Sequence, residues 1–240
     1  MIKKLIKPLV YDIVHFGGKL KCTVCGRRSK YFQEAGIIPR QEATCPFCGA
    51  VERHRLFGHY IKTQTDFERT PPKSALHVTP EKILEKKMRS LIGKGYITGD
   101  LFDPRADLKM DITDIQFPDS SFEFIYCSHV LEHVLDDRKA MREFYRVLSD
   151  DGFAVLIVPI YPEPTIEDPS IEDPKERLRL FGQEDHVRKY GPDFADRLKE
   201  AGFKVQVIAK TDLLSPEEIK IAGLTYCCLL YTSPSPRDRG

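Results

Sequence analysis

From Ala75 onward, segments typical of strands alternate with segments typical of helices, and this alternation constrains the fold more than any other feature of the sequence. Short apolar runs predict strands at 75–78, 96–98, 108–110, 122–127, 153–158 and 204–209. Helices are expected between them at about 80–92, 137–148 and 192–201. The pattern predicts an α/β domain with a doubly wound, mostly parallel sheet that helices cover on both faces.

The residues that follow the predicted strands are candidates for a binding site, because ligands of such sheets bind beyond the carboxyl ends of the strands. Asp100 follows the second strand, 21 residues after Thr79. An acidic side chain at this place and spacing binds ribose hydroxyls in doubly wound nucleotide-binding folds. Asp103 and Asp107 are alternatives for that role, and a turn-capping carboxylate is the structural alternative.

The stretch after the third strand, "DITDIQFPDSSFEFIYCSHVLEHV", and the later "YRVLSDDG" carry a resemblance to a known family. They resemble class I, type-11-like methyltransferases that depend on S-adenosylmethionine (SAM), over about residues 75–160. The resemblance implies a Rossmann-like fold and an enzyme that transfers a methyl group from SAM. It places the ribose on Asp100, the adenine near Asp111 and Ile112, and the methionine part near Thr79, Pro80, Ser128 and His129.

The loop after the first strand, "LHVTPE" at 76–81, departs from the family pattern. The family usually has an acid at the position of His77 and glycines at about Thr79 and Glu81. We expect Thr79 to cap the following helix, Pro80 to be its first residue and Glu81 to lie in its first turn. The free N–H groups of the helix could then hold the SAM carboxylate, and Glu81 could meet the SAM ammonium.

Three histidines are candidates for catalysis. Transfer of a methyl group from a sulfonium needs a general base only if the acceptor arrives protonated. His129 and His133 flank Leu131-Glu132 at a helical i, i+4 spacing, and His186 lies in a segment expected to fold over the site. Imidazole titrates near neutral pH, so each can act as a base. A packing role is the alternative for each one, and Glu132 could orient a histidine or the sulfonium.

Two CxxC pairs precede this domain. Cys22 and Cys25 are separated from Cys45 and Cys48 by a spacing that falls in the range of four-cysteine zinc sites. The sequence predicts structural Zn²⁺ on these four thiolates, with disulfides as the alternative. Together with "IEDPKERLRLFGQEDHVRKYG" downstream, the cysteine module resembles a methyltransferase subgroup that carries an N-terminal zinc ribbon.

The charge is distributed unevenly along the chain. Residues 1–62 hold 12 Lys/Arg against 4 Asp/Glu, whereas the other 178 residues hold 25 against 32. A basic module indicates an anionic partner, and "ERHR" at 52–55 is a candidate anion clamp. Salt bridges to the acidic part, or a solvated surface, are the alternatives.

The chain is predicted to have three parts. These are an N-terminal helix with a zinc-ribbon module at 1–65, a methyltransferase domain at 75–227, and a tail at 228–240. The tail "CLLYTSPSPRDRG" is similar to the translation of a sequencing adaptor, so we predict that the gene is truncated within the last strand. The sequence has no membrane-spanning run and no secretory signal, and a cytoplasmic location is expected.

Three functions remain open from the sequence. The first is a SAM-dependent methyltransferase that acts on a small molecule or a glycan precursor. The second is an RNA base methyltransferase that grips RNA with the basic zinc ribbon. The third is a zinc-stabilised SAM-binding protein without turnover, which the missing glycines motivate.

Overall fold

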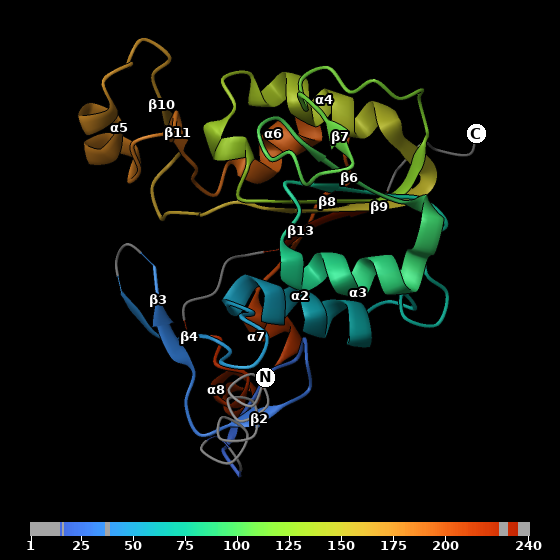
Figure 1. Ribbon diagram of the computed structural model, residues 1–240. Helices are drawn as coiled ribbons and strands as arrows, with labels where there is room; N and C mark the ends of the chain where they lie inside the picture. The colour runs from blue at the N-terminus through green and yellow to red at the C-terminus, as the bar shows by residue number, and fades with distance from the viewer. Residues whose placement is uncertain (1–14, 16, 37–38, 226–229, 235–240) are drawn as a thin grey trace. The chain divides into compact units, whose positions relative to one another are not determined.

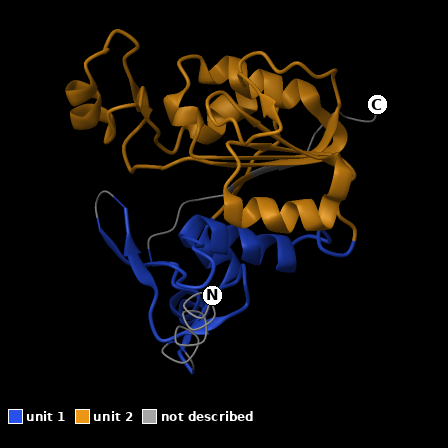
Figure 2. Cartoon of the chain, in the orientation of Figure 1, with its two compact units in different colours: residues 1–69, 209–227 blue, residues 70–208, 228–240 orange. Residues whose placement is uncertain are grey.

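The computed structural model describes residues 15, 17–36, 39–225 and 230–234 (Figure 1). The chain divides into two compact units (Figure 2). Unit 1 comprises residues 1–69 and 209–227, and unit 2 comprises residues 70–208 and 228–240. The helix expected near the N-terminus lies outside the described residues. Within the described ranges, no helix is both long enough and apolar enough to cross a membrane.

Among the described residues of unit 1, there are two short antiparallel ladders and three helices. Strand β1 (Leu20–Lys21) pairs with β2 (Arg28–Ser29), and β3 (Gln33–Ala35) pairs with β4 (Arg40–Thr44). The helices are α2 (Glu52–Thr63), α7 (Lys210–Leu213) and α8 (Pro216–Ile221). Residues 209–227, which the sequence analysis assigned to the methyltransferase domain, therefore group with the cysteine module.

The side chain of Arg55 explains how these distant segments associate. It is completely buried, and its guanidinium donates to the carbonyl oxygens of Ala43, Ala50, Ala222 and Gly223 over 2.6–2.8 Å. Hydrogen bonds to a charged donor contribute about 1.5–3 kcal/mol each, less the cost of burying the charge. Arg55 thus joins α2 to the turn after α8.

Unit 2 is built on a seven-stranded sheet in the order β12-β13-β9-β8-β5-β6-β7. Strands β5 to β9 in this sheet are parallel, whereas β13 is antiparallel to both β9 and β12. Their bounds are β5 (Ala75–Val78), β6 (Tyr96–Asp100), β7 (Leu108–Lys109), β8 (Phe122–Ser128), β9 (Leu148–Ile157), β12 (Gln206–Ile208) and β13 (Leu230–Pro234).

Helices lie on both faces of this sheet, as the alternating pattern predicts. Figure 1 shows α3 (Lys82–Ile92) on one face and α4 (Asp137–Val147) with α6 (Phe194–Glu200) on the other. The apolar stripe of α4 is fully buried at Ala140, Met141, Phe144 and Val147. The strand order and the helix layers confirm the Rossmann-like fold class.

A smaller hairpin lies outside the main sheet. Strand β10 (Ile166–Glu167) pairs with β11 (Arg188–Lys189), and α5 (Pro174–Phe181) lies between them in the chain. Asp173 caps α5 by accepting a hydrogen bond from the backbone N–H of Lys175 over 2.9 Å. The sequence "IEDP" occurs twice, at 166–169 and 171–174. The first copy supplies both residues of β10, and the second supplies the N-cap of α5.

Two segments differ from the expected elements. Strand β9 begins at Leu148 instead of Phe153, and its register against β8 shifts between Phe122 and Phe124. Strand β13 lies within the segment predicted to be an adaptor, where Tyr231 is buried and its ring lies 4.7 Å from that of Phe194. The adaptor origin of 228–240 stays a prediction.

Candidate active site

The carboxyl ends of the two central strands turn in the same unusual way. Thr79, directly after β5, has φ +51°, and His129, directly after β8, has φ +56°. The N–H of Thr79 donates to the carbonyl of Gly99 over 2.9 Å, and that of His129 donates to the carbonyl of Ile157 over 2.7 Å. Each residue completes a ladder with the next strand and then turns the chain sharply away.

The structure corrects the expectation for the loop after β5. Thr79 is not the helix cap, and Pro80 is not the first helical residue: Glu81 is the N-cap of α3, and it makes no side-chain capping bond. Left-handed backbone in a residue other than glycine costs about 1–2 kcal/mol, so Thr79 adopts a glycine-like turn at an energetic cost. Such strain concentrates at functional sites.

Asp100 lies at the end of β6, beside this turn. One oxygen, Oδ1, accepts the N–H groups of Phe102 and Asp103, each over 2.7 Å, which is the turn-capping role. Its second oxygen makes no hydrogen bond to the described residues. The alternatives for the ribose are engaged elsewhere, since Asp107 accepts from Thr98 and Arg89, and Asp103 pairs with Arg105.

The other predicted cofactor residues continue along the same edge of the sheet. Asp111 is exposed and accepts the N–H of Thr113 over 2.8 Å, whereas Ile112 is buried. Ser128 ends β8 and is buried, and its hydroxyl has no hydrogen-bond partner among the described residues. These residues, with Thr79, Pro80, Glu81 and Asp100, follow the carboxyl ends of four adjacent parallel strands.

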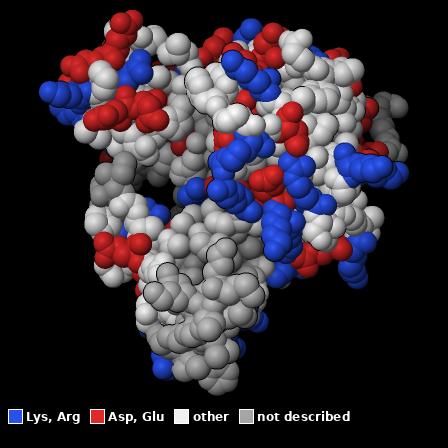
Figure 3. Space-filling model, viewed as in Figure 1, with Lys and Arg blue, Asp and Glu red and all other residues white. Residues whose placement is uncertain are grey.

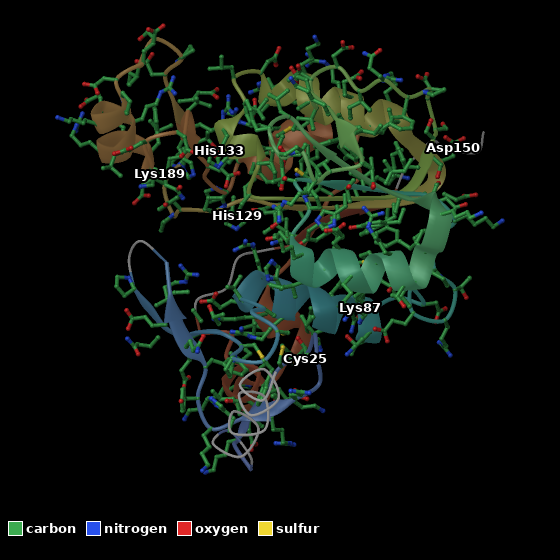
Figure 4. All side chains as sticks on the ribbon, viewed as in Figure 1. Cys25, Lys87, His129, His133, Asp150 and Lys189 are labelled. Carbon is green, nitrogen blue, oxygen red and sulfur yellow. The ribbon has the colours of Figure 1, made fainter. Side chains whose placement is uncertain are left out.

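The three histidines do not share one helical face. His129 precedes the short 3₁₀ helix η2 (Leu131–His133) and turns in the left-handed region, so the expected α-helical i, i+4 relation to His133 is wrong. Figure 4 shows His129 and His133 near the same end of the strands of the unit 2 sheet. His186, which is buried, lies with its ring 4.7 Å from that of His133. Burial lowers the pKa of His186 below its usual value.

Glu132 lies between these histidines and is almost fully buried. Its Oε1 is 3.2 Å from Nδ1 of His129, although the geometry is not that of a hydrogen bond. The sequence pattern indicated that Glu132 could orient a histidine, and the proximity agrees with that hypothesis. Its burial was not readable from the sequence.

A buried ionic network, which the sequence analysis missed, holds the segment around the histidines. Arg188 donates to Glu167 over 3.0 Å and to the carbonyl of Leu131 over 2.9 Å, next to Glu132. Arg197 joins Glu167 to Asp137, and its guanidinium lowers the pKa of Glu167 to about 2. A cavity of about 230 Å³ lies beside this network and is lined in part by Glu167 and Arg188.

The four cysteines of unit 1 form a compact cluster. Sγ of Cys22 lies 3.7 Å from Sγ of Cys48, and Sγ of Cys25 lies 3.9 Å from Sγ of Cys45. These separations are too long for disulfides, whose sulfurs lie about 2.05 Å apart. Tetrahedral zinc with Zn–S bonds of about 2.3 Å requires sulfurs about 3.8 Å apart. The cluster thus has the dimensions of a four-thiolate zinc site.

The two knuckles that carry the cysteines have the same backbone geometry. Gly26 and Gly49 have φ +75° and +76°, and each donates its N–H over 2.8 Å to the carbonyl of the first cysteine of its pair. Glycine adopts this left-handed conformation without a steric penalty. The sequence therefore builds the same tight turn twice.

The family model that the chain matches covers residues of unit 2. Residues 97–156 match the family model described as a methyltransferase domain. An uncharacterized methyltransferase of Bacillus subtilis (strain 168), YcgJ, is 37% identical over 75 residues, which are 31% of this chain and 28% of that protein. The chain thus matches less than a third of the length of this relative.

Solved structures with a similar fold include two methyltransferases. One is a complex described as that between the Haloferax volcanii Trm112 methyltransferase activator and "the putative methyltransferase", with 15% identity, a TM-score of 0.48, and coverage of 76% of this chain and 91% of that one. The other is an S-adenosylmethionine dependent methyltransferase from Mesorhizobium loti, with 18% identity, a TM-score of 0.48, and coverage of 67% and 90%. The residues that the family model matches lie within the parallel part of the unit 2 sheet, whose strand order is that of a Rossmann-like fold.

Proposed function

We propose that the chain is a SAM-dependent methyltransferase that binds SAM at the carboxyl edge of the unit 2 sheet. The observation that carries the proposal is the pair of left-handed turns at Thr79 and His129. They lie at the ends of β5 and β8, which are neighbours in the middle of the parallel strands. Ligands of open α/β sheets bind at this edge.

The cofactor is assigned residue by residue along this edge. The second oxygen of Asp100 accepts a ribose hydroxyl, while Oδ1 continues to hold the loop. Asp111 and Ile112 flank the adenine, with the apolar side chain against the ring. The methionine part of SAM is surrounded by Thr79, Pro80, Glu81 and Ser128. The buried hydroxyl of Ser128 can donate a hydrogen bond to the SAM carboxylate.

His129 is the histidine that we propose as the general base when the acceptor arrives protonated. Its side chain is 28% exposed, so an acceptor can reach it, and Glu132 lies 3.2 Å away to favour the imidazolium that forms. His133 and His186 are the other two candidates for catalysis. Positioning the acceptor against the sulfonium remains the main contribution of the protein, worth about 7–11 kcal/mol.

For unit 1 we propose structural Zn²⁺ on Cys22, Cys25, Cys45 and Cys48. Four thiolates complete a tetrahedral shell and leave no open position for chemistry, so the ion would stabilise the fold of this unit. A small molecule or a glycan precursor is the proposed acceptor.

An RNA acceptor has less support. Two arginines of the basic module that could have contacted phosphate are engaged within unit 1, since Arg55 is buried and Arg40 donates to Glu52 over 3.0 Å. On the face that Figure 3 shows, basic and acidic side chains of unit 2 are interspersed instead of forming one basic stripe.

Native mass spectrometry of the purified chain, followed by incubation with methyl-labelled SAM and host metabolite or RNA fractions, tests the proposal. We expect bound SAM or S-adenosylhomocysteine and label in the small-molecule fraction. Label in RNA alone would favour the RNA alternative. SAM binding without label in either fraction would favour a protein without turnover.

A further inference from the structure

Glu132, His133 and His186 form a cluster that the cofactor assignment leaves unused. One side-chain ligand atom from each lies within 4.8 Å of the others. Glu132 and His133 belong to η2, and His186 lies between α5 and β11. The N–H of Val187 donates to the carbonyl of Glu132 over 2.9 Å, which fixes the two segments against each other.

Two members of the cluster are buried and have polar atoms that make no hydrogen bond, although Nδ1 of His129 lies 3.2 Å from Oε1 of Glu132. Glu132 is 1% exposed and His186 is 3% exposed. Neither carboxylate oxygen of Glu132 nor Nε2 of His186 has a hydrogen-bond partner among the described residues. An ionised carboxylate in such surroundings costs several kcal/mol unless a cation compensates it. The cluster therefore has the polarity of a cation site.

Nδ1 of His186 and Nδ1 of His133 each lie near an oxygen atom that acts as a hydrogen-bond acceptor. Nδ1 of His186 is 3.2 Å from the carbonyl oxygen of Phe181, and Nδ1 of His133 is 3.2 Å from a carboxylate oxygen of Asp185. In neutral His186, Nδ1 therefore carries the hydrogen and Nε2 presents its lone pair, and the Asp185 carboxylate favours the same tautomer in His133. Histidines that bind metals show this same arrangement, with the other ring nitrogen donating to a carbonyl or a carboxylate.

We propose that Glu132, His133 and His186 bind a divalent transition-metal ion of the zinc class. One carboxylate and two imidazoles are a zinc ligand set. Ligand atoms of tetrahedral zinc with bonds of about 2.0–2.1 Å lie about 3.4 Å apart, so the three atoms reach that spacing by small side-chain rotations. This site differs from the cysteine cluster because three protein ligands leave one position open.

The open position gives the ion a place in the reaction. A hydroxyl of the acceptor would bind there, the metal would lower its pKa, and its proton would pass to His129. The oxygen would then form the bond to the methyl carbon as the bond to the sulfonium sulfur breaks, which leaves S-adenosylhomocysteine. The acceptor would then be an oxygen nucleophile that reaches the ion beside His129. This assignment of the acceptor rests on the proposed function, whereas binding of the ion does not.

Metal analysis of the full chain, purified and dialysed against Zn²⁺, tests the site. We expect two zinc ions per chain in the wild type and one in Glu132→Gln, which removes the ligand charge but preserves its shape. Asp185→Asn, whose side chain is 70% exposed, should weaken Zn²⁺ binding about 10–100-fold in calorimetric titration. Glu184→Gln changes an exposed neighbour outside the cluster and should behave as wild type.

One ion per chain in the wild type, or a second ion that persists in Glu132→Gln, would overturn the proposal. Circular dichroism checks that each variant is folded, and His133→Asn replaces Glu132→Gln if the latter is not. SAM titration on the same samples separates the two hypotheses. A second zinc ion without SAM binding would support the metal site and contradict the methyltransferase. SAM binding with only one zinc ion per chain would support the cofactor site and contradict the second metal site.

Discussion

Thr79 and His129 adopt nearly the same left-handed conformation at the ends of two neighbouring parallel strands, with φ +51° and +56°. Nucleotide-binding loops usually have glycine where the backbone must turn in this way. Here a threonine and a histidine are held there by hydrogen bonds to Gly99 and Ile157 of the adjacent strands. The loop after β5 therefore keeps the glycine-like turn without the glycine.

Replacing Thr79 with glycine should stabilise the protein. The side chain of Thr79 is exposed, so little packing is lost, and glycine removes the left-handed strain at some cost in chain entropy. We expect the free energy of unfolding to rise by about 0.5–1 kcal/mol in urea denaturation. Thr79→Val, which keeps the branched Cβ and removes the hydroxyl, serves as the control and should not stabilise. Lower stability of the glycine variant than of the valine variant would show that the turn is not strained.

Asp100→Asn should weaken SAM binding without unfolding the loop. The Asn side chain keeps an oxygen to accept the N–H groups of Phe102 and Asp103, and it replaces the charged acceptor proposed for the ribose with a donor. Loss of a charge-assisted hydrogen bond of about 1.5–3 kcal/mol raises the Kd about 10–100-fold.

Asp107→Asn provides the matched control for this prediction. Asp107 accepts from Arg89 and Thr98, so its substitution should lower thermal stability while the Kd for SAM stays near the wild-type value. Calorimetric titration gives Kd and differential scanning calorimetry gives stability. Equal Kd values for wild type and Asp100→Asn would remove Asp100 from the cofactor site.

Acid should weaken the hairpin of β10 and β11 through Glu167. Hydrogen bonds from Arg197 and Arg188 lower the pKa of Glu167 from 4.5 to about 2 in the folded protein. Because the pKa of Glu167 is lower in the folded protein than in the unfolded chain, ionised Glu167 stabilises the fold when the pH is above the pKa of the unfolded chain. This stabilisation is lost as the pH falls from about 4.5 to 2. The thermal stability of Glu167→Gln should therefore depend less on pH in this range than that of the wild type. Thermal unfolding at a series of pH values measures this dependence. Parallel curves for both proteins would contradict the depressed pKa.

Removing one cysteine of the cluster should release the metal and unfold unit 1. Structural zinc in small modules supplies about 10 kcal/mol of folding energy, more than a unit of this size can replace. We expect Cys45→Ser to lose the cluster's zinc and helical signal from α2. Cys127→Ala, at a buried position in β8 outside the cluster, should retain that zinc. Normal zinc content in Cys45→Ser would exclude the four-thiolate site.

The strands and helices between Ala75 and Val158 were largely predictable because the apolar residues within each one are spaced as its type of secondary structure requires. Strand β5 was expected and found at Ala75–Val78, and α4 was expected within one residue of its observed end. The place of Asp100 at the end of β6 was predictable from the strand pattern, whereas its role in binding ribose stays a prediction. These features depend on local sequence and on one general rule of topology.

What the sequence did not reveal depends on tertiary contacts. Thr79 and Pro80 have the composition of a helix start, but the bond from Thr79 to Gly99 holds the turn in another conformation. Arg55 was interpreted as part of a candidate anion clamp, yet it is buried and donates to carbonyls more than 160 residues away along the chain. The buried carboxylate of Glu132 likewise acquires its surroundings only when η2 meets the segment before β11.

Calorimetric titration of the full chain with SAM tests most directly whether unit 2 binds the proposed cofactor. We expect saturable binding at one site per chain with a Kd between about 1 and 100 μM, the usual range for a metabolic substrate. The heat should be lost or weakened in Asp100→Asn and preserved in Asp107→Asn. Absence of heat up to about 1 mM SAM, from protein that unfolds cooperatively and contains zinc, would contradict the proposed cofactor and with it the proposed function.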